Sequence, residues 1–189
     1  PLLVRAGIEP ELLTQNRARI SPDQYTRLVR ILWLATQDEH LGFDRVPRRL
    51  GTFATMCQLI IHAGTLGKAL ERTNQFYRLF GDDWGITLDH NNQFFRRFGD
   101  EWGIALERDT HEARLTLHMP RLDTEENFIF ITESMLMIWH GLACWLIERR
   151  IPLERMLFAY PQPPHIDEYD ALFFAPVLRF NADRTEMTF

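Results

Sequence analysis

The sequence has few cysteines and no long, uninterrupted apolar run. Cys57 and Cys144 stand far apart without CxxC spacing, so they fit neither a disulfide framework nor a zinc site, and they favour a reducing, cytoplasmic setting. The longest apolar stretch, around residues 135–147, is interrupted by a histidine and a glycine and falls short of the roughly 20 residues that span a bilayer. We therefore expect a cytoplasmic protein that is not inserted in a membrane.

Lysine is almost missing as well, because Lys68 is the only lysine among 21 basic residues. The formal net charge is −5, which argues against a nucleic-acid surface, since such surfaces carry an excess of basic side chains. No low-complexity tract or flexible linker interrupts the 189 residues, and an apolar fraction of 46% is enough to fill one core. We expect one domain over residues 1–189 that does not bind DNA by itself.

Catalytic motifs are also lacking. The sequence contains no GxSxG elbow, phosphate loop, HExxH motif or paired metal-ligand cluster. The carboxylate pairs Asp82-Asp83 and Asp100-Glu101 each follow a glycine in what reads as an exposed turn, which favours solvated acids over acid-base chemistry. We predict no catalytic residue, no cofactor and no metal ligand.

Capping patterns predict the helices. Ser21-Pro22-Asp23-Gln24 combines a capping serine, a proline suited to the first helical position and a glutamine that completes a capping box. Apolar spacing predicts further helices at residues 53–60 and from a Thr65 cap to about residue 80. Asp123, with Glu126 three residues later, predicts a long helix that closes at residues 148–150. Its interior is apolar almost all round, so we expect it to be central.

Short alternating patterns predict the strands. They fall at residues 84–88 and 113–117, and after the long helix at residues 156–160, 177–180 and 186–189, with a short helix at residues 166–173 between them. This order indicates an α+β fold, with a helical N-terminal part packed on a mainly antiparallel sheet and one long central helix.

A repeat lies within residues 74–106. The segment 74–88 recurs with small changes as 92–106, eighteen positions later. Two copies are fewer than a solenoid needs, so we interpret them as a local tandem duplication, natural or constructed. The second copy runs straight into the strand at 113–117 and is expected to keep the original pairing. Trp84 and Trp102 are equivalent positions in the two copies.

A set of short sequence motifs is spread over nearly the whole chain. In chain order they include Ala6-Gly7-Ile8-Glu9-Pro10, Asp38-Glu39-His40-Leu41-Gly42-Phe43, Gly64-Thr65-Leu66-Gly67-Lys68, Ile151-Pro152-Leu153, Tyr169-Asp170-Ala171-Leu172-Phe173 and Ala175-Pro176-Val177-Leu178-Arg179-Phe180.

Taken together, these motifs resemble the N-terminal, "arabinose-binding" type of ligand-binding domain found in AraC-type bacterial transcription regulators. Within that family they are most similar to the ornithine-responsive regulators. The resemblance implies a domain that binds a small metabolite in a pocket between helices and sheet, forms a homodimer and passes occupancy to a DNA-binding domain. That second domain carries two helix-turn-helix units, which nothing in residues 1–189 matches. Contact with DNA is therefore expected only through a domain absent from this chain.

Five residues are candidates for ligand contact: His62, Tyr77, Trp139, His140 and Tyr160. Each residue type also has a structural explanation. A histidine at a helix end can have its hydrogen bonds satisfied within the chain, a tryptophan can belong to the core, and a tyrosine can make a structural hydrogen bond. Tyr160 stands where many members of the family have a histidine before a proline. For the dimer surface we expect the long helix, through Met135, Leu142 and Leu146. A small-molecule enzyme with an unrecognised site, or a protein-interaction module without ligand, are the alternatives.

Overall fold

A computed structural model describes residues 1–15, 17–43, 47–80, 85–88, 103–108, 112–119 and 122–189. Two compact units divide the chain, Pro1–Thr55 and Met56–Phe189, and each is described by itself. Trp84, Trp102 and the carboxylate pairs at 82–83 and 100–101 lie outside the described residues.

The first unit is helical. It contains α1 (Leu2–Ala6), a 3-10 helix (η1, Pro10–Thr14) and α2 (Pro22–Thr36). The predicted capping box at the start of α2 is confirmed: Ser21 Oγ accepts the Gln24 N–H at 3.2 Å, and Gln24 Oε1 accepts the Ser21 N–H at 2.8 Å. No cap signal announces α1, which ends at Gly7 with a left-handed φ of 75°.

The helices α3 (Thr52–Ile60) and α4 (Leu66–Tyr77) follow the predicted positions. Thr65 caps α4, since its side-chain oxygen accepts the Lys68 N–H at 3.2 Å. A 3-10 turn (η2, Arg78–Phe80) continues α4. The buried face of α4 presents Ala69, Leu70, Thr73, Phe76 and Tyr77.

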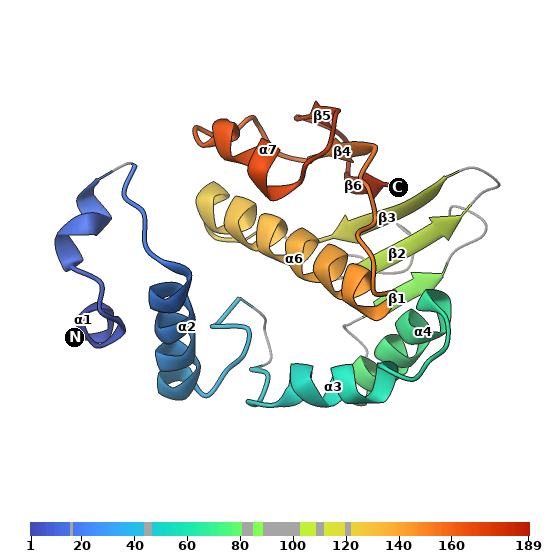
Figure 1. The fold of residues 1–189 in the computed structure, drawn as a ribbon, viewed down its shortest axis with the longest axis horizontal. Coiled ribbons are helices and arrows are strands. Elements are labelled where there is room, and N and C mark those ends of the chain that lie inside the picture. Colours follow the sequence, from blue (N-terminus) through green and yellow to red (C-terminus); the bar gives the residue numbers. More distant parts are fainter. Residues whose placement is uncertain (16, 44–46, 81–84, 89–102, 109–111, 120–121) are drawn as a thin grey trace. The chain divides into compact units, whose positions relative to one another are not determined.

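The long helix α6 (Glu125–Leu146) lies against one face of the strands in the second unit (Figure 1). Its cap is Thr124, whose side-chain oxygen accepts the Asn127 N–H at 3.2 Å, so the predicted cap at Asp123 is one residue early. By length and composition alone α6 could cross a membrane, a weak criterion that core helices also meet. One face of α6 is buried and several apolar side chains on the other are exposed.

The described strands form one six-stranded sheet in the order β1-β2-β3-β6-β4-β5. The pairs β2–β3, β3–β6 and β4–β6 are antiparallel, whereas β1–β2 and β4–β5 are parallel. The sheet is therefore mixed but mainly antiparallel, and the α+β prediction is confirmed. The strands are β1 (Gly85–Leu88), β2 (Gly103–Arg108), β3 (Ala113–His118), β4 (Arg155–Leu157), β5 (Leu178–Arg179) and β6 (Thr185–Thr188).

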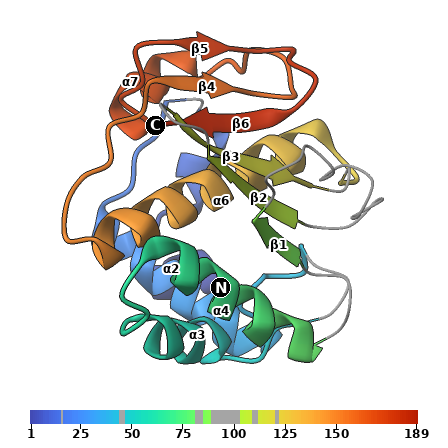
Figure 2. The same cartoon turned by 90° about the vertical axis from the view of Figure 1, so that its right-hand side faces the viewer.

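The two copies of the repeat supply neighbouring strands. In the parallel pair of β1 and β2, equivalent positions face each other, from Gly85 with Gly103 to Leu88 with Leu106. The second copy pairs with β3, and β1 lies at the edge of the sheet; that the second copy keeps the original pairing stays a prediction. At the other end of the sheet, β4, β5 and β6 lie near α7 (Tyr169–Leu172), as Figure 2 shows. A 3-10 turn (η3, Ile166–Glu168) directly precedes α7.

Candidate functional site

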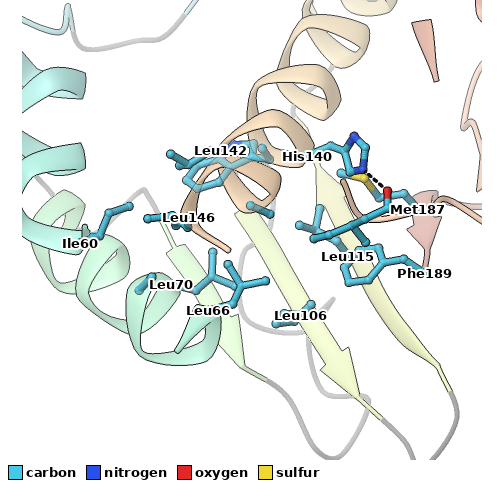
Figure 3. Close-up of a pocket in the computed structure, with 14 residues that line it drawn as sticks. Ile60, Leu66, Leu70, Leu106, Leu115, His140, Leu142, Leu146, Met187 and Phe189 are labelled. Atoms are coloured by element: carbon cyan, nitrogen blue, oxygen red, sulfur yellow. Dashed lines mark hydrogen bonds between the residues drawn. The ribbon is translucent and has the colours of Figure 1, made fainter. Parts of the chain in front are cut away.

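A small cavity lies between α6, α4, the end of α3 and the strands. Apolar side chains from each of these elements converge on it, including Ile60, Leu70, Leu115 and Leu142 (Figure 3). Its volume is about 10 Å³, roughly the space that one water molecule occupies. A metabolite therefore fits this cavity only if α6 or α4 moves away from the sheet.

Two predicted ligand residues, Trp139 and His140, line this cavity. His140 Nε2 lies 2.8 Å from the Ile151 carbonyl oxygen, and since a carbonyl only accepts, Nε2 carries the proton and donates it. The Cys144 sulfur lies 3.5 Å from the same nitrogen and accepts the Ile151 N–H at 3.3 Å. These contacts fasten the end of α6 to the segment that follows it.

A larger cleft lies at the beginning of α6. Its volume is about 310 Å³, within the usual range of small-molecule sites. Eight residues line it: Leu122, Asp123, Thr124, Glu125, Phe128, Ala159, Tyr160 and Pro161. Asp123 and Glu125 are exposed, whereas Tyr160 is almost fully buried. The cleft thus combines aromatic surface with negative charge and has room for a metabolite.

Tyr160 belongs to a chain of hydrogen bonds that leads from the cleft back to α6. Its hydroxyl lies 3.0 Å from the Tyr169 hydroxyl, and Tyr169 donates to the Glu133 carboxylate. His165 Nε2 donates to the same carboxylate at 2.8 Å. Burial, above all, raises the pKa of both tyrosines well beyond the usual value, so both hydroxyls stay protonated at neutral pH.

An aromatic cluster surrounds these hydroxyls. Phe158 is fully buried at its centre, with ring centroids at 5.2 Å from both Tyr160 and Tyr169 and a stacked contact at 5.0 Å with Phe180. Packing of this kind fixes the orientation of each ring. The cluster therefore holds the rings of Tyr160 and Tyr169 in the orientation that their hydrogen bond requires.

Sequence reasoning missed Glu133, His165 and Tyr169. Glu133 is the only acidic residue in α6 beyond the first turn, and a lone carboxylate within an apolar helix is a signal of a buried partner. His165 and Tyr169 gave no such signal, because their proximity to Glu133 depends on a contact between segments more than 30 positions apart.

The remaining candidates lie elsewhere among the described residues. His62 is exposed, and Tyr77 is buried edge-on against Phe76 at 5.3 Å; neither lines the cavity or the cleft. Of the residues predicted for the dimer surface, Leu142 is buried and lines the cavity, Leu146 lines it while half-buried, and Met135 is half-buried.

Within the described part of the chain, no three histidine, cysteine or acidic side chains come together where they could hold a metal ion. The polar group next to the 310 Å³ cleft is a hydrogen-bonded set of four side chains: Tyr160 and the unpredicted Glu133, His165 and Tyr169.

A family model described as the N-terminal arabinose-binding domain of AraC transcription regulators matches residues 1–189. The chain belongs to this family of N-terminal domains of AraC transcription regulators. No curated protein matches the chain.

Proposed function

We propose that this chain is an effector-sensing domain of a cytoplasmic bacterial regulator and that its effector binds in the cleft at the beginning of α6. The observation that carries the proposal is that this cleft, of about 310 Å³ against about 10 Å³ for the interior cavity, is lined by Tyr160, which begins the hydrogen-bond chain to α6. Two larger clefts, at residues 179–184 and 144–150, are not lined by Tyr160, Tyr169 or Glu133. A metabolite enters the cleft without moving a helix, whereas the cavity must first be opened. Binding proceeds without turnover.

The lining of the cleft favours a cationic amine. The exposed Asp123 and Glu125 attract a positive charge, and the half-buried Phe128 offers a ring against which an ammonium group and its carbon chain can lie. The positive end of the α6 dipole opposes this attraction, but it amounts to about half a charge and faces two carboxylates. The balance therefore favours an amine over an anion.

Two routes connect the cleft to α6. Glu125 and Phe128 belong to the first turn of the helix, so a bound effector contacts α6 directly. Tyr160 also reaches α6 further along, through Tyr169 and Glu133. An effector that prefers one position of α6 would shift the population toward that position, and equal affinity for both positions would shift nothing.

In this proposal, effector binding acts by changing how two copies of the domain are arranged in a dimer. In this proposal the chain forms a homodimer, and occupancy of the cleft changes how the two copies present the DNA-binding domains to which they are joined. Effector binding and dimer geometry are then linked reciprocally.

A thermal-shift titration tests the effector site. The panel contains lysine, ornithine, a diamine, choline and L-arabinose, the last because the family description names it. We expect an amine to raise the melting temperature, with a stabilisation that grows as the logarithm of one plus its concentration over its dissociation constant. The Asp123→Asn/Glu125→Gln double variant should lose this shift relative to its own ligand-free baseline, whereas the exposed Glu154→Gln control should keep it.

Each other outcome decides against part of the proposal. Stabilisation by arabinose that survives in the double variant contradicts an amine site in the cleft. No stabilisation by any compound favours an interaction module without ligand. Chemical change of the bound compound, followed by mass spectrometry, favours an enzyme.

A further inference from the structure

The face of the sheet that points away from the interior cavity carries charged side chains. Leu115 and Met187 line that cavity, so the next residue along each strand points to the opposite face, because side chains alternate along a strand. We call this opposite face the outer face. The register places Arg179, Leu157 and Glu186 in one row on it, across β5, β4 and β6. Figure 2 shows β4 between the other two strands.

A cleft of about 690 Å³ lies where the chain turns from β5 toward β6. Its volume is within the usual range of small-molecule sites. Seven residues line it: Leu157, Arg179, Phe180, Asn181, Ala182, Asp183 and Arg184. None of them lines the cleft at the beginning of α6, so the two clefts are separate sites.

Backbone hydrogen bonds fix the wall of this cleft. The Phe158 N–H donates to the Arg179 carbonyl oxygen at 2.8 Å, and the Ala182 N–H donates to the Phe158 carbonyl oxygen at 3.0 Å. The Asn181 N–H donates to the Tyr160 carbonyl oxygen at 2.9 Å. The chain after β5 thus stays paired with the chain after β4. A wall that is already ordered costs little further ordering when a ligand binds.

A buried carboxylate restrains one of the two arginines that line the cleft. Glu186 is 1% exposed, and its Oε2 lies 2.7 Å from Arg184 Nη2. Its Oε1 lies 3.7 Å from Arg155 Nη2 and accepts the Thr188 hydroxyl at 3.4 Å. A charge this deeply buried has to be paired, and the pairing holds Arg184 in place. Because a guanidinium has five N–H donors, Arg184 keeps donors for a ligand in the cleft.

The second arginine of the cleft, Arg179, is not needed to neutralise the buried carboxylate. Its side chain is exposed and, among the described residues, makes no hydrogen bond or ion pair. Arg155, Arg179 and Arg184 bring three positive charges to this part of the sheet, against the two carboxylates of Glu186 and Asp183. One positive charge is in excess. A monoanion neutralises this excess, whereas a phosphate dianion would exceed it.

We propose that this cleft binds a small monocarboxylate, whose carboxylate lies between the guanidinium groups of Arg179 and Arg184. Hydrogen bonds between arginine and carboxylate are charge-assisted and often bidentate. The carbon skeleton of the ligand lies against Leu157, which is half-buried in the strand between the two arginines. The site is independent of the proposed amine cleft and gives the domain a second ligand, of opposite charge.

An NMR titration of the whole ¹⁵N-labelled chain tests the site. Acetate and benzoate are added at constant ionic strength, with chloride as the reference anion. Both carboxylates should cause saturable shifts of the amide resonances of residues 179–184. Arg179→Gln should raise the dissociation constant for benzoate at least about tenfold, because it removes a charged donor. Arg149→Gln makes the same charge change at an exposed site outside the cleft and should leave the constant unchanged.

Asp183→Asn gives a test of opposite sign. This variant removes an exposed negative charge from the cleft, so the dissociation constant for benzoate should fall about two- to fivefold, the usual effect of one exposed charge interaction. A variant that merely perturbed the fold would weaken binding instead.

Several results would overturn the monocarboxylate site. They are shifts that chloride reproduces, the absence of saturable shifts with both carboxylates, equal constants for Arg179→Gln and Arg149→Gln, and tighter binding of phosphate than of benzoate. The amine site is tested separately, because choline and the diamine carry no carboxylate. Their effect on the melting temperature should be the same in Arg179→Gln as in the wild type, so either site can fail without the other.

Discussion

A single buried carboxylate organises the segment between α2 and α3. Asp38 accepts three backbone N–H groups, from His40 at 2.9 Å, Gly42 at 2.7 Å and Arg48 at 2.7 Å. Burial alone would raise the pKa of Asp38, but these N–H groups and the neighbouring His40 together hold it below its usual value. The family-like sequence motif at residues 38–43 therefore has a structural role in this chain, because its aspartate fixes the backbone of the segment between α2 and α3.

Replacing Asp38 by asparagine should destabilise the first unit. One of the two side-chain oxygens becomes an NH₂ group that cannot accept, so a buried N–H loses its partner at about 1–3 kcal/mol. Because the folded pKa is lowered, the stabilising effect of Asp38 is present above its unfolded value of about 3.9 and is lost as pH falls through the folded value. Amide hydrogen exchange of His40, Gly42 and Arg48 at pH 7 measures the first effect. Asp183→Asn, at an exposed site, should leave these rates unchanged.

Tyr169 carries the hydrogen-bond chain between Tyr160 and Glu133. We expect Tyr169→Phe to lower the free energy of unfolding by about 1–3 kcal/mol, because both neighbours lose a partner in a buried setting. The raised pKa also means that the wild type loses stability as pH rises above the unfolded tyrosine value of about 10, and the variant should lose less. Urea denaturation at pH 7 and pH 10.5 tests this. Equal stability of Tyr169→Phe and the exposed Tyr25→Phe would refute it.

At the scale of elements, local signals predicted the helix starts well. The capping residues Ser21 and Thr65 lie where the sequence indicated. At α6 two consecutive residues, Asp123 and Thr124, can both serve as caps, so the choice depends on the path of the preceding chain. The five-residue α1 was missed because a helix this short owes its stability to its surroundings rather than to its own sequence.

The first turn of α6 offers a direct comparison of the two caps. Thr124→Ala should lower the free energy of unfolding by about 1 kcal/mol, because the Asn127 N–H loses the oxygen at 3.2 Å. Asp123→Ala should cost less, since only its charge near the helix dipole is removed. Thermal denaturation followed by circular dichroism gives both values, and the reverse order of stabilities would contradict the observed cap.

The site was less predictable than the helices. Tyr160 was expected to contact a ligand and lines the cleft. Its position there depends on an aromatic cluster of Phe158, just after β4, Tyr169 in α7 and Phe180, just after β5. Trp139 and His140, which were predicted to contact a ligand, line the small cavity between helices and sheet, and their contact with a ligand stays a prediction. That the space around them is nearly filled follows from side-chain packing, which no local pattern encodes.

At the scale of the whole molecule, the repeat raises the question of whether the fold requires both copies or only one. β1 pairs only with β2 and lies at the edge of the described sheet. If the repeat is a tandem duplication, one copy is enough to continue the helix from Thr65 and to pair with β3.

Deletion of residues 74–91 should therefore leave a chain that folds cooperatively. The deletion joins Thr73 to Asn92, so the retained copy supplies equivalents of Phe76 and Tyr77 as Phe94 and Phe95. We expect a single melting transition, a circular dichroism spectrum of wild-type shape and retained amine binding. A chain without cooperative unfolding would show that both copies are required.

The central proposal is that occupancy of the cleft alters the association of two copies. The most direct measurement is the dimer dissociation constant, by sedimentation equilibrium, with and without a saturating concentration of the most stabilising amine from the panel. The account predicts a change in this constant for the wild type and none for Asp123→Asn/Glu125→Gln. An identical constant with and without bound amine would mean zero coupling free energy and would contradict it.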